Sequence, residues 1–489
     1  MSKALKNKTK LNDVVDVVAD FGADPTGVAD STSAIQNAVT AATGKQLVFP
    51  AGTYKVSSTI NLPTDIRITG LGARGMGVYS VTLSAAFAGP VLQYSAGGNT
   101  AIDIVLEYFS VIGNLNTYGA GNGITINNGQ GGHIHNVVVA GFGTNQINLT
   151  GTTNSLVCRD VYCSEGGYGP GTANAGFYST GTYNIFDNCN TDDCKYGIYI
   201  DTGGSGNVVS GGVIEGATVA QIFVGNISSV GKVSVHDVRI NCTRGFKGIV
   251  CDGLYTTIAN NFIFGNTGTY GIDITANGYG AVLNGNTVLG FATAARVNTS
   301  GFNRIVGNYL SGTTTGLEIP AVSLYLTLVE GNDLSGVTNS VLHTSTNLVT
   351  YIGNRYDNTS GTYKAPTVTA GQPSADFPVP WTPAVAGAAV TVNSAQYTKI
   401  GQQVTVQFDL TWPATADATA VKITGMPFNV LNTIWTAGSI GYCGQPLVTN
   451  LASIDATHLQ LFSAGGGNIT NAQMSGQRIW GSISYFSAS

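Results

Sequence analysis

The chain repeats itself about every two dozen residues between residues 136 and 354, and this period constrains its fold more than any other feature. Each unit carries a small polar corner followed by a short apolar strand, and successive corners are 22 to 28 residues apart. A period in this range is typical of stacked supersecondary units, each of which buries its apolar side chains against its neighbours. The corners lie at Asn136, Asp160, Asn188, Gly212, Asp237, Asn261, Asn286, Asn308, Asn332 and Asn354.

The repeated units are predicted to be β-strands. No long stretch with a helical period is found, whereas residues 197–201, 248–252 and 271–275 alternate between inward and outward positions. Gly and Asn close these runs, and both residue types tolerate the left-handed backbone of tight corners. Two or three such strands in each turn of the chain predict a parallel β-helix, with turns stacked roughly 4.8 Å apart.

The composition fits such a solenoid and limits its partners. Charged residues make up only 10% of the sequence, against about 25% in an ordinary globular protein, and Gly accounts for 66 of 489 residues. The net charge is −5 without a basic stripe, so nucleic acid is not an expected partner. No run approaches the ~18 apolar residues of a membrane span, and no apolar signal-peptide segment follows Met1. We therefore expect neither membrane insertion nor a signal peptide.

The seven Cys residues are expected to be reduced thiols. Cys163 and Cys251 fall where inward strand residues are expected, and buried free thiols are typical of a protein made in a cytoplasm. Cys189 and Cys194 lack a second pair at metal-ligand spacing, and no calcium loop is present. We expect no metal site and no cofactor.

The N-terminal region predicts a helix that covers the first coil. Asp30 or Ser31 is a suitable N-cap, and Gly44 follows the end of the helix. A helix here would cover an otherwise open sheet edge, which solenoids require. Its apolar stripe is formed by Ala34, Ile35, Ala38 and Val39.

Several segments of the same region resemble the N-terminal cap of the pectate-lyase-like β-helix superfamily. They are residues 21–24 (Phe-Gly-Ala-Asp), 30–32 (Asp-Ser-Thr), 34–36 (Ala-Ile-Gln) and 48–54 (Val-Phe-Pro-Ala-Gly-Thr-Tyr). The resemblance extends through the coils over about residues 18–358. That superfamily includes pectate lyases, polygalacturonases and many bacteriophage tailspikes. The resemblance implies a right-handed parallel β-helix and is poor at specifying an activity.

The repeat fades after Tyr356, and a different domain follows. Residues 364–383 are rich in Pro, which is a linker composition, and the alternating strands beyond them predict a β-sandwich. The predicted organisation is an N-terminal attachment segment (residues 1–20), a parallel β-helix (21–363), a linker (364–383) and a C-terminal β-sandwich (384–489) for trimerisation or glycan binding.

This domain order, without a signal peptide, resembles a bacteriophage tailspike. The resemblance implies a homotrimer that is made in the host cytoplasm, is located in the virion tail, and binds a bacterial surface polysaccharide such as capsule, exopolysaccharide or O-antigen. Residues 1–20 leave no room for a folded head-binding domain. We expect them to dock as a peptide on another tail or baseplate protein of the virion.

The longest step between corners holds a glycine-rich insertion, residues 165–175. Such a bulge in a tight solenoid is a candidate wall of a functional site. When neighbouring coils are aligned through Val161 and Cys189, Glu165 lies over Asp193, and their backbones are expected to be roughly 4.8 Å apart.

Asp192 and Glu215 are expected near the same level as this pair. Paired carboxylates suit glycoside cleavage, because one donates a proton while the other attacks or activates water. Their separation is about 5–5.5 Å in retaining glycosidases and larger in inverting ones. The alternative is structural, since solenoid corners are rich in acidic side chains that hydrogen-bond the backbone. The predicted catalytic residues are Glu165, Asp193, Asp192 and Glu215.

Outward positions of the second strand predict an aromatic ladder. In successive coils these positions are Tyr178, Tyr199, Phe223, Val250 and Asp273. Aromatic rings stack on the C–H faces of sugars; the alternative is contact with a neighbouring subunit, where aromatic residues are also enriched. The predicted substrate-binding residues are Tyr178, Tyr199, Phe223, Asp201, Tyr168 of the insertion, and Arg239.

Basic residues flank the acidic region. They could hold uronate or phosphate groups of an acidic polysaccharide, or act as the base of a lyase, although isolated surface bases are more often only solvated. His133 and His135 straddle a predicted strand start, and one of them is expected to face outward. The flanking basic residues are Arg159, Lys195, Arg239, Arg244 and Lys247.

The sequence thus predicts a receptor-binding tailspike with polysaccharide-degrading activity, a hydrolase rather than a lyase. A non-catalytic glycan-binding tail or adhesion protein is the first alternative. A free pectate-lyase-like polysaccharide lyase is the second, and the C-terminal domain and missing signal peptide disfavour it.

Overall fold

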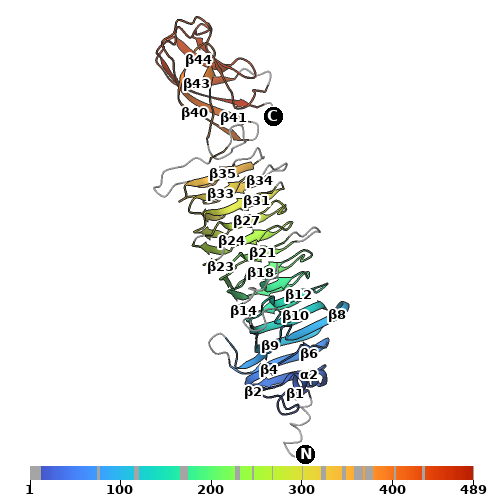
Figure 1. Cartoon of the computed structure of the whole chain (residues 1–489). Helices are drawn as coiled ribbons and strands as arrows, with labels where there is room; N and C mark the ends of the chain where they lie inside the picture. The colour runs from blue at the N-terminus through green and yellow to red at the C-terminus, as the bar shows by residue number, and fades with distance from the viewer. Residues whose placement is uncertain are drawn as a thin grey trace, which may run out of the picture.

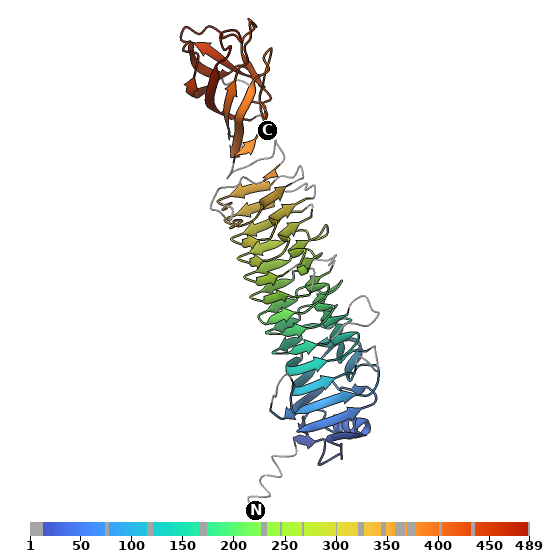
Figure 2. The same cartoon turned by 60° about the vertical axis from the view of Figure 1, so that its left-hand side comes forward.

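A computed structural model of the chain describes residues 13–73, 78–114, 121–165, 174–225, 232–244, 247–266, 268–299, 301–320, 327–343, 349–356, 367–368, 378–400, 403–431 and 436–487. These residues form a right-handed parallel β-helix of about 12 turns, followed by an antiparallel β-domain (Figure 1). The predicted fold class is confirmed. A second view shows the coils stacked in one column, with the C-terminal domain beyond the last coil of the β-helix (Figure 2).

Two parallel sheets build the β-helix, and we call them sheet A and sheet B. Sheet A contains β1 (Val14–Asp16), β2 (Thr26–Asp30), β3 (Gln46–Pro50), β4 (Gly52–Val56), β6 (Asp65–Leu71), β7 (Val81–Ala85), β9 (Asp103–Ile112), β11 (His133–Ala140), β13 (Val157–Arg159), β14 (Tyr162–Ser164), β16 (Ile185–Asp187), β17 (Asn190–Asp192), β19 (Val208–Ser210), β20 (Val213–Glu215), β22 (Ser234–His236), β23 (Arg239–Cys242), β25 (Thr257–Ala259), β26 (Phe262–Gly265), β28 (Val282–Asn284), β29 (Thr287–Leu289), β31 (Asn303–Val306), β32 (Tyr309–Ser311), β34 (Thr327–Glu330) and β36 (Val349–Ile352). Sheet B contains β5 (Ile60–Asn61), β8 (Leu92–Ala101), β10 (Ile124–Gln130), β12 (Asn145–Thr150), β15 (Ala175–Ser179), β18 (Tyr196–Ile200), β21 (Ala220–Val224), β24 (Lys247–Cys251), β27 (Tyr270–Ile274), β30 (Thr293–Val297), β33 (Thr315–Ile319), β35 (Asn339–His343) and β37 (Thr367–Val368).

A typical middle coil has two short strands of sheet A, a left-handed corner between them, and one strand of sheet B. The corner residue has a positive φ, for example +54° at Asp160 and +58° at Asp237. From the coil of Asn261 onward, the prediction placed the corner one residue too late. The left-handed residues there are Asn260, Gly285, Gly307, Gly331 and Gly353, and the predicted Asn261, Asn286, Asn308, Asn332 and Asn354 follow them.

These five asparagines point into the β-helix and form a hydrogen-bonded ladder. Asn308 Oδ1 accepts both the backbone N–H and the Nδ2 of Asn286, each at 2.9 Å. Asn308 Nδ2 in turn donates to Asn332 Oδ1 at 2.8 Å and to the Leu283 carbonyl at 3.0 Å. Each amide thus satisfies backbone groups of two coils, which explains why these inward positions are polar.

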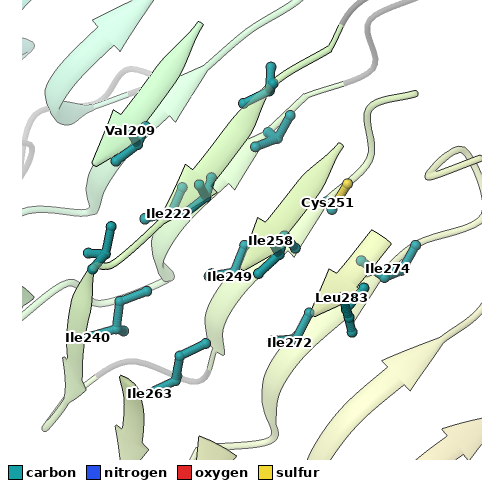
Figure 3. Packing of buried hydrophobic residues seen from close by; sticks show 14 of the residues in the cluster. Val209, Ile222, Ile240, Ile249, Cys251, Ile258, Ile263, Ile272, Ile274 and Leu283 are labelled. Atoms are coloured by element: carbon teal, nitrogen blue, oxygen red, sulfur yellow. The ribbon is translucent and has the colours of Figure 1, made fainter. Parts of the chain in front are cut away.

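The rest of the interior is filled by apolar columns, one from each strand of a coil (Figure 3). Ile222, Ile249 and Ile272 come from sheet B and are stacked in register. Two further columns come from the two strands of sheet A: Ile240, Ile263 and Val288, and Val235, Ile258 and Leu283. Every one of these side chains is fully buried, which stabilises the fold by roughly 1.5–3 kcal/mol per side chain. The six buried cysteines, Cys251 among them, line the same core as free thiols.

The predicted N-terminal helix is confirmed as α2 (Thr32–Ala41), with Ser31 at the N-cap position. Its buried residues include Ile35, Ala38 and Val39 of the predicted stripe. Asp30 Oδ1 accepts the backbone N–H of Thr32 at 3.0 Å, so the residue before the N-cap satisfies a free donor of the first turn.

Two short strands lie inside segments that the sequence assigned outside the β-helix. β1 lies within residues 1–20 and pairs with β3, Val15 opposite Leu47. β37 lies within residues 364–383 and pairs with β35. The sheets of the β-helix therefore extend into the expected attachment segment and the expected linker.

The C-terminal strands form one strongly curved antiparallel sheet. They are β38 (Val379–Pro380), β39 (Ala384–Val385), β40 (Thr391–Ile400), β41 (Gln403–Thr411), β42 (Lys422–Thr424), β43 (Ala437–Cys443), β44 (Val448–Ser453), β45 (Leu459–Ser463) and β46 (Arg478–Phe486). β43 joins the two halves, because it pairs with β44 at Gly438 and with β46 from Ser439 onward. Buried Trp412 donates from Nε1 to Asn471 Oδ1 at 3.0 Å. In the described part of the chain, no helix has the length and apolarity needed to cross a membrane.

Candidate functional site

The structure places Glu165 and Asp193 at equivalent positions in neighbouring coils. β14 and β17 pair with a 28-residue offset, Ser164 opposite Asp192, and the Glu165 N–H donates to the Asp192 carbonyl at 3.2 Å. Both Glu165 and Asp193 follow their strands with a φ of +51°. The stacking expected from the alignment of the coils is therefore present.

Asp192 and Glu215 lie on the outward face of sheet A beside this pair. Thr191 pairs with Ile214, which brings the two acids to the same level of adjacent coils. Gly216 leaves room for the carboxylate of Asp192, since a Cβ on Gly216 would lie 2.2 Å from Asp192 Oδ1. The structure thus gathers the four predicted acids at the carboxyl ends of adjacent strands of sheet A. We call them the acid cluster: Glu165, Asp192, Asp193 and Glu215.

Two polar side chains from the coil after Glu215 contact the acid cluster. Arg244 forms an ion pair with Asp193 across an intervening coil. Asn241 Nδ2 donates to Glu215 Oε2 at 3.3 Å, and it occupies the position opposite Glu215 in the sheet. On the other side, the half-buried Tyr162 lies on the outward face of β14, opposite Asn190 of β17. Burial and the negative charge of Asp192 raise the Tyr162 pKa. Acidic, cationic and phenolic groups therefore share one surface.

The electrostatic setting of Asp192 favours its protonated form. Burial raises its pKa above the ordinary 3.8, and the negative charges of Asp193 and Glu215 raise it further. A carboxyl group that keeps its proton to a higher pH is better suited to proton donation than an ordinary Asp. Within the cluster, Asp192 is thus the residue best placed to act as a general acid.

The same shift makes a stability prediction for Asp192→Asn. The native state holds the Asp192 proton more tightly than the unfolded chain, so ionisation disfavours folding. This penalty is absent below pH 3.8, the ordinary pKa of the group. It grows as the pH rises from there through the raised native pKa. We expect Asp192→Asn to unfold at a higher temperature than the wild type at neutral pH, with the difference closing in acid. Thermal unfolding across a pH series measures this, and a difference that does not change with pH would contradict it.

The predicted aromatic ladder is present on the outward face of sheet B. The rings of Tyr178 and Tyr199 are stacked with centroids 5.6 Å apart, and those of Tyr199 and Phe223 with centroids 4.7 Å apart. Tyr196 packs edge-on against Tyr199 at 4.8 Å. Tyr178 donates its hydroxyl to Asp201 at 2.6 Å, so Asp201 lies beside the ladder as expected. All four rings are half-buried and keep part of their surface accessible.

The outward column continues past the ladder into a buried ion cluster. Val250 and Asp273 occupy the next two rungs, as predicted, but both are covered. The fully buried carboxylate of Asp273 accepts from Lys247 Nζ at 2.7 Å and from Arg296 Nε at 2.8 Å. The Arg296 guanidinium stacks 4.1 Å from the Tyr270 ring centroid. This end of the face is a satisfied ionic network.

The remaining predicted residues have varied positions. Tyr168 lies outside the described residues. Arg239 is exposed on the outward face of β23, on sheet A, away from the ladder. Lys195 Nζ lies 5.9 Å from the Tyr196 ring centroid. Arg159 pairs with Asp187 rather than with the acid cluster. His133 and His135 both face outward, with Ile134 buried between them, because β11 is already an extended strand at His133.

Sequence reasoning missed several contributors to the site. Arg244 was identified as a flanking base, but its pairing with Asp193 across two coils was not. Tyr196 was missed because it lies three residues before Tyr199, a spacing that places residues on opposite faces of an ideal strand. Gly216 carried no recognisable pattern, since its role depends on a close approach between coils.

Comparisons with known proteins agree with this fold. Residues 15–89 match the family model described as "Rhamnogalacturonase A/epimerase, pectate lyase-like". The superfamily resemblance is thereby confirmed. No curated protein sequence matches the chain significantly.

Solved structures are similar over most of the chain. The Dettilon tailspike protein gp208 is 12% identical, with 98% of this chain and 95% of that chain covered at a TM-score of 0.59. The A-module of the Azotobacter vinelandii mannuronan C-5 epimerase AlgE6 is 18% identical, with 72% and 100% covered at 0.60. The AlgE4 A-module is 16% identical, with 73% and 100% covered at 0.53. At these identities the similarity shows a shared β-helix fold.

Proposed function

We propose that this protein is a tailspike-like protein that binds a bacterial surface polysaccharide through the aromatic ladder and cleaves it at the acid cluster. The observation that carries this proposal is the proximity of the two features along the chain. Asp193 of the acid cluster directly follows strand β17 of sheet A, and Tyr196 begins the ladder strand β18 three residues later. A glycan lying on the ladder would therefore extend toward the carboxylates.

Hydrolysis is the chemistry that this arrangement supports best. A glycosidase needs one carboxyl group to protonate the leaving oxygen and a second carboxylate to attack or to activate water. The raised pKa of Asp192 suits it to the first role. Glu165 and Asp193, on adjacent coils, are the candidates for the second role.

Binding without cleavage is the second candidate function, and a specific observation favours it. Asp193 is already paired with Arg244, and Glu215 accepts from Asn241. A carboxylate engaged by the protein's own donors is less available to a substrate. In that case the acid cluster would stabilise the coils, and the ladder alone would hold the glycan.

Product analysis with purified surface polysaccharides tests the proposed function. Release of new reducing ends without unsaturated sugars supports hydrolysis. Ultraviolet absorbance from an unsaturated uronate would instead identify a lyase. Binding without either product would overturn cleavage and support the second candidate.

Virion assembly forms the other part of the proposal. The protein is proposed to be a homotrimer in the virion tail, attached through residues 1–20 to another tail or baseplate protein. The similarity to the Dettilon tailspike protein over nearly the whole chain supports the tail location. Light scattering of the purified protein tests the trimer. Deletion of residues 1–12, which precede β1 of the β-helix, should abolish incorporation into virions and spare glycan cleavage.

The ladder makes its own prediction. Tyr199→Ala removes the central ring of the stack, and we expect glycan affinity to fall roughly tenfold, or about 1.4 kcal/mol. Tyr309→Ala is the matched control, because Tyr309 is an outward tyrosine on sheet A. Calorimetric titration with oligosaccharides measures the effect. Unchanged affinity together with loss of the trimer would instead assign the ladder to the subunit interface.

A further inference from the structure

A concave site distinct from the acid cluster lies on the outward face of sheet A, in the N-terminal half of the β-helix. The cavity has a volume of about 300 Å³, within the range of small-molecule sites. It is built by β6, β9, β11 and β13, which are consecutive rungs of the sheet. We call it the basic pocket, and its lining residues are Arg67, Val105, His133, His135, Val157 and Arg159.

A buried carboxylate holds one wall of the basic pocket in place. Glu107 is only 1% exposed. It accepts from Arg67 Nε at 2.6 Å, from Thr69 Oγ1 at 2.7 Å and from His135 Nε2 at 2.8 Å. Charge-assisted hydrogen bonds of this kind are strong and directional, so the Arg67 and His135 side chains are pre-positioned at the wall.

Several donors at the pocket remain unused by the protein. Arg159 donates from Nε to Asp187 at 2.8 Å, and its two terminal nitrogens have no partner in the described parts of the chain. The Nη1 of Arg67 and the ring nitrogens of His133 likewise have no acceptor among the described residues. Both acidic neighbours are already engaged, Glu107 by Arg67 and His135 and Asp187 by Arg159. The pocket can therefore donate further hydrogen bonds to a ligand that carries acceptor atoms. The donors are guanidinium and imidazole N–H groups.

We propose that the basic pocket binds an anionic group carried on a sugar, a carboxylate or a phosphate. Guanidinium groups match the planar oxygens of both anions. Val105 and Val157 lie at adjacent rungs on either side of His133 and present an apolar surface to a sugar's C–H face. The site is separate from the acid cluster, since it lies on the strands before the left-handed corner rather than after it. The basic pocket gives the protein a second contact with an acidic polysaccharide. This contact does not require the acid cluster to be catalytic.

Titration with three sugars tests the proposal: glucuronate as the carboxylate probe, glucose 6-phosphate as the phosphate probe and glucose as the neutral control. We expect at least one anionic sugar to bind the full-length protein and glucose not to bind. The tighter of the two identifies the preferred anion. Failure of both to bind, or equal binding of glucose, would overturn the site.

Variants locate the binding. Arg159→Ala and His133→Ala should each weaken the anionic sugar roughly tenfold, as expected for loss of a charge-assisted hydrogen bond. Arg304→Ala is the matched control, because Arg304 is exposed in the same outward column of sheet A, far from the pocket. Wild-type affinity in both pocket variants, or a change in their oligomeric state in place of affinity, would refute the proposal. Glu165→Gln should leave this binding intact, so a failure of the proposed cleavage would remain distinguishable.

Discussion

Glu165→Gln and Asp193→Asn are each expected to lower polysaccharide cleavage by roughly 100-fold or more, while the β-helix remains folded. Both substitutions keep the size of the side chain and remove its ability to ionise. The two residues occupy equivalent left-handed positions in adjacent coils, with Glu165 hydrogen-bonded through its backbone to Asp192. Loss of either carboxylate would leave the sugar without a nucleophile or without an activated water. Reducing-end release under saturating substrate measures the effect.

A matched control separates catalysis from the structural role of acids at corners. Asp237 has a φ of +58° and a largely exposed side chain, and it lies at the other corner of the coils. Asp237→Asn should therefore retain full activity. Asp192→Asn should lose activity as the acid variants do, because it removes the proposed proton donor. Full activity of both Glu165→Gln and Asp193→Asn would exclude these two carboxylates from catalysis.

Asn308→Ala is expected to give a large loss of stability, because Asn308 is a central rung of the buried asparagine ladder. The change removes the acceptor of two donors on Asn286 and the donor to the Leu283 carbonyl. A buried polar group left without a partner costs about 1–3 kcal/mol, so a total loss of roughly 3 kcal/mol is expected. The midpoint of chemical unfolding, followed by circular dichroism, measures this loss.

Asn284→Ala is the control for this prediction. Asn284 lies on the same strand stack, but its side chain is exposed and only its backbone takes part in the sheet. Its replacement should change stability by no more than about 0.5 kcal/mol. Equal unfolding midpoints of the two variants would show that Asn308 of the buried asparagine ladder contributes no more to stability than an exposed amide.

The offset between neighbouring coils was predictable wherever the repeat was regular. Counting residues from Val161 to Cys189 was sufficient to place Glu165 over Asp193, since stacked parallel strands pair in register. Alternation within the strands was likewise sufficient to place Tyr178, Tyr199 and Phe223 on one outward column. Both inferences depend only on local periodicity, which the chain carries explicitly.

The corners were less predictable, because two structural roles favour the same residue type. Asn260 is left-handed, while the adjacent Asn261 is an inward rung of the hydrogen-bonded ladder. Asn tolerates the first role and supplies the amide for the second, so the sequence alone does not distinguish them. The backbone conformation does, and it moves the later corners by one residue.

The sequence by itself determined the repeat, the inward and outward faces and the coil offset, because each follows from a one-dimensional period. The tertiary structure alone decided which polar groups meet. It paired Arg244 with Asp193 two coils away, buried Asp273 beneath Lys247 and Arg296, and positioned Arg67 and His135 around Glu107. Such contacts depend on side-chain direction and on burial between adjacent coils, and neither is encoded in the spacing of residues along the chain.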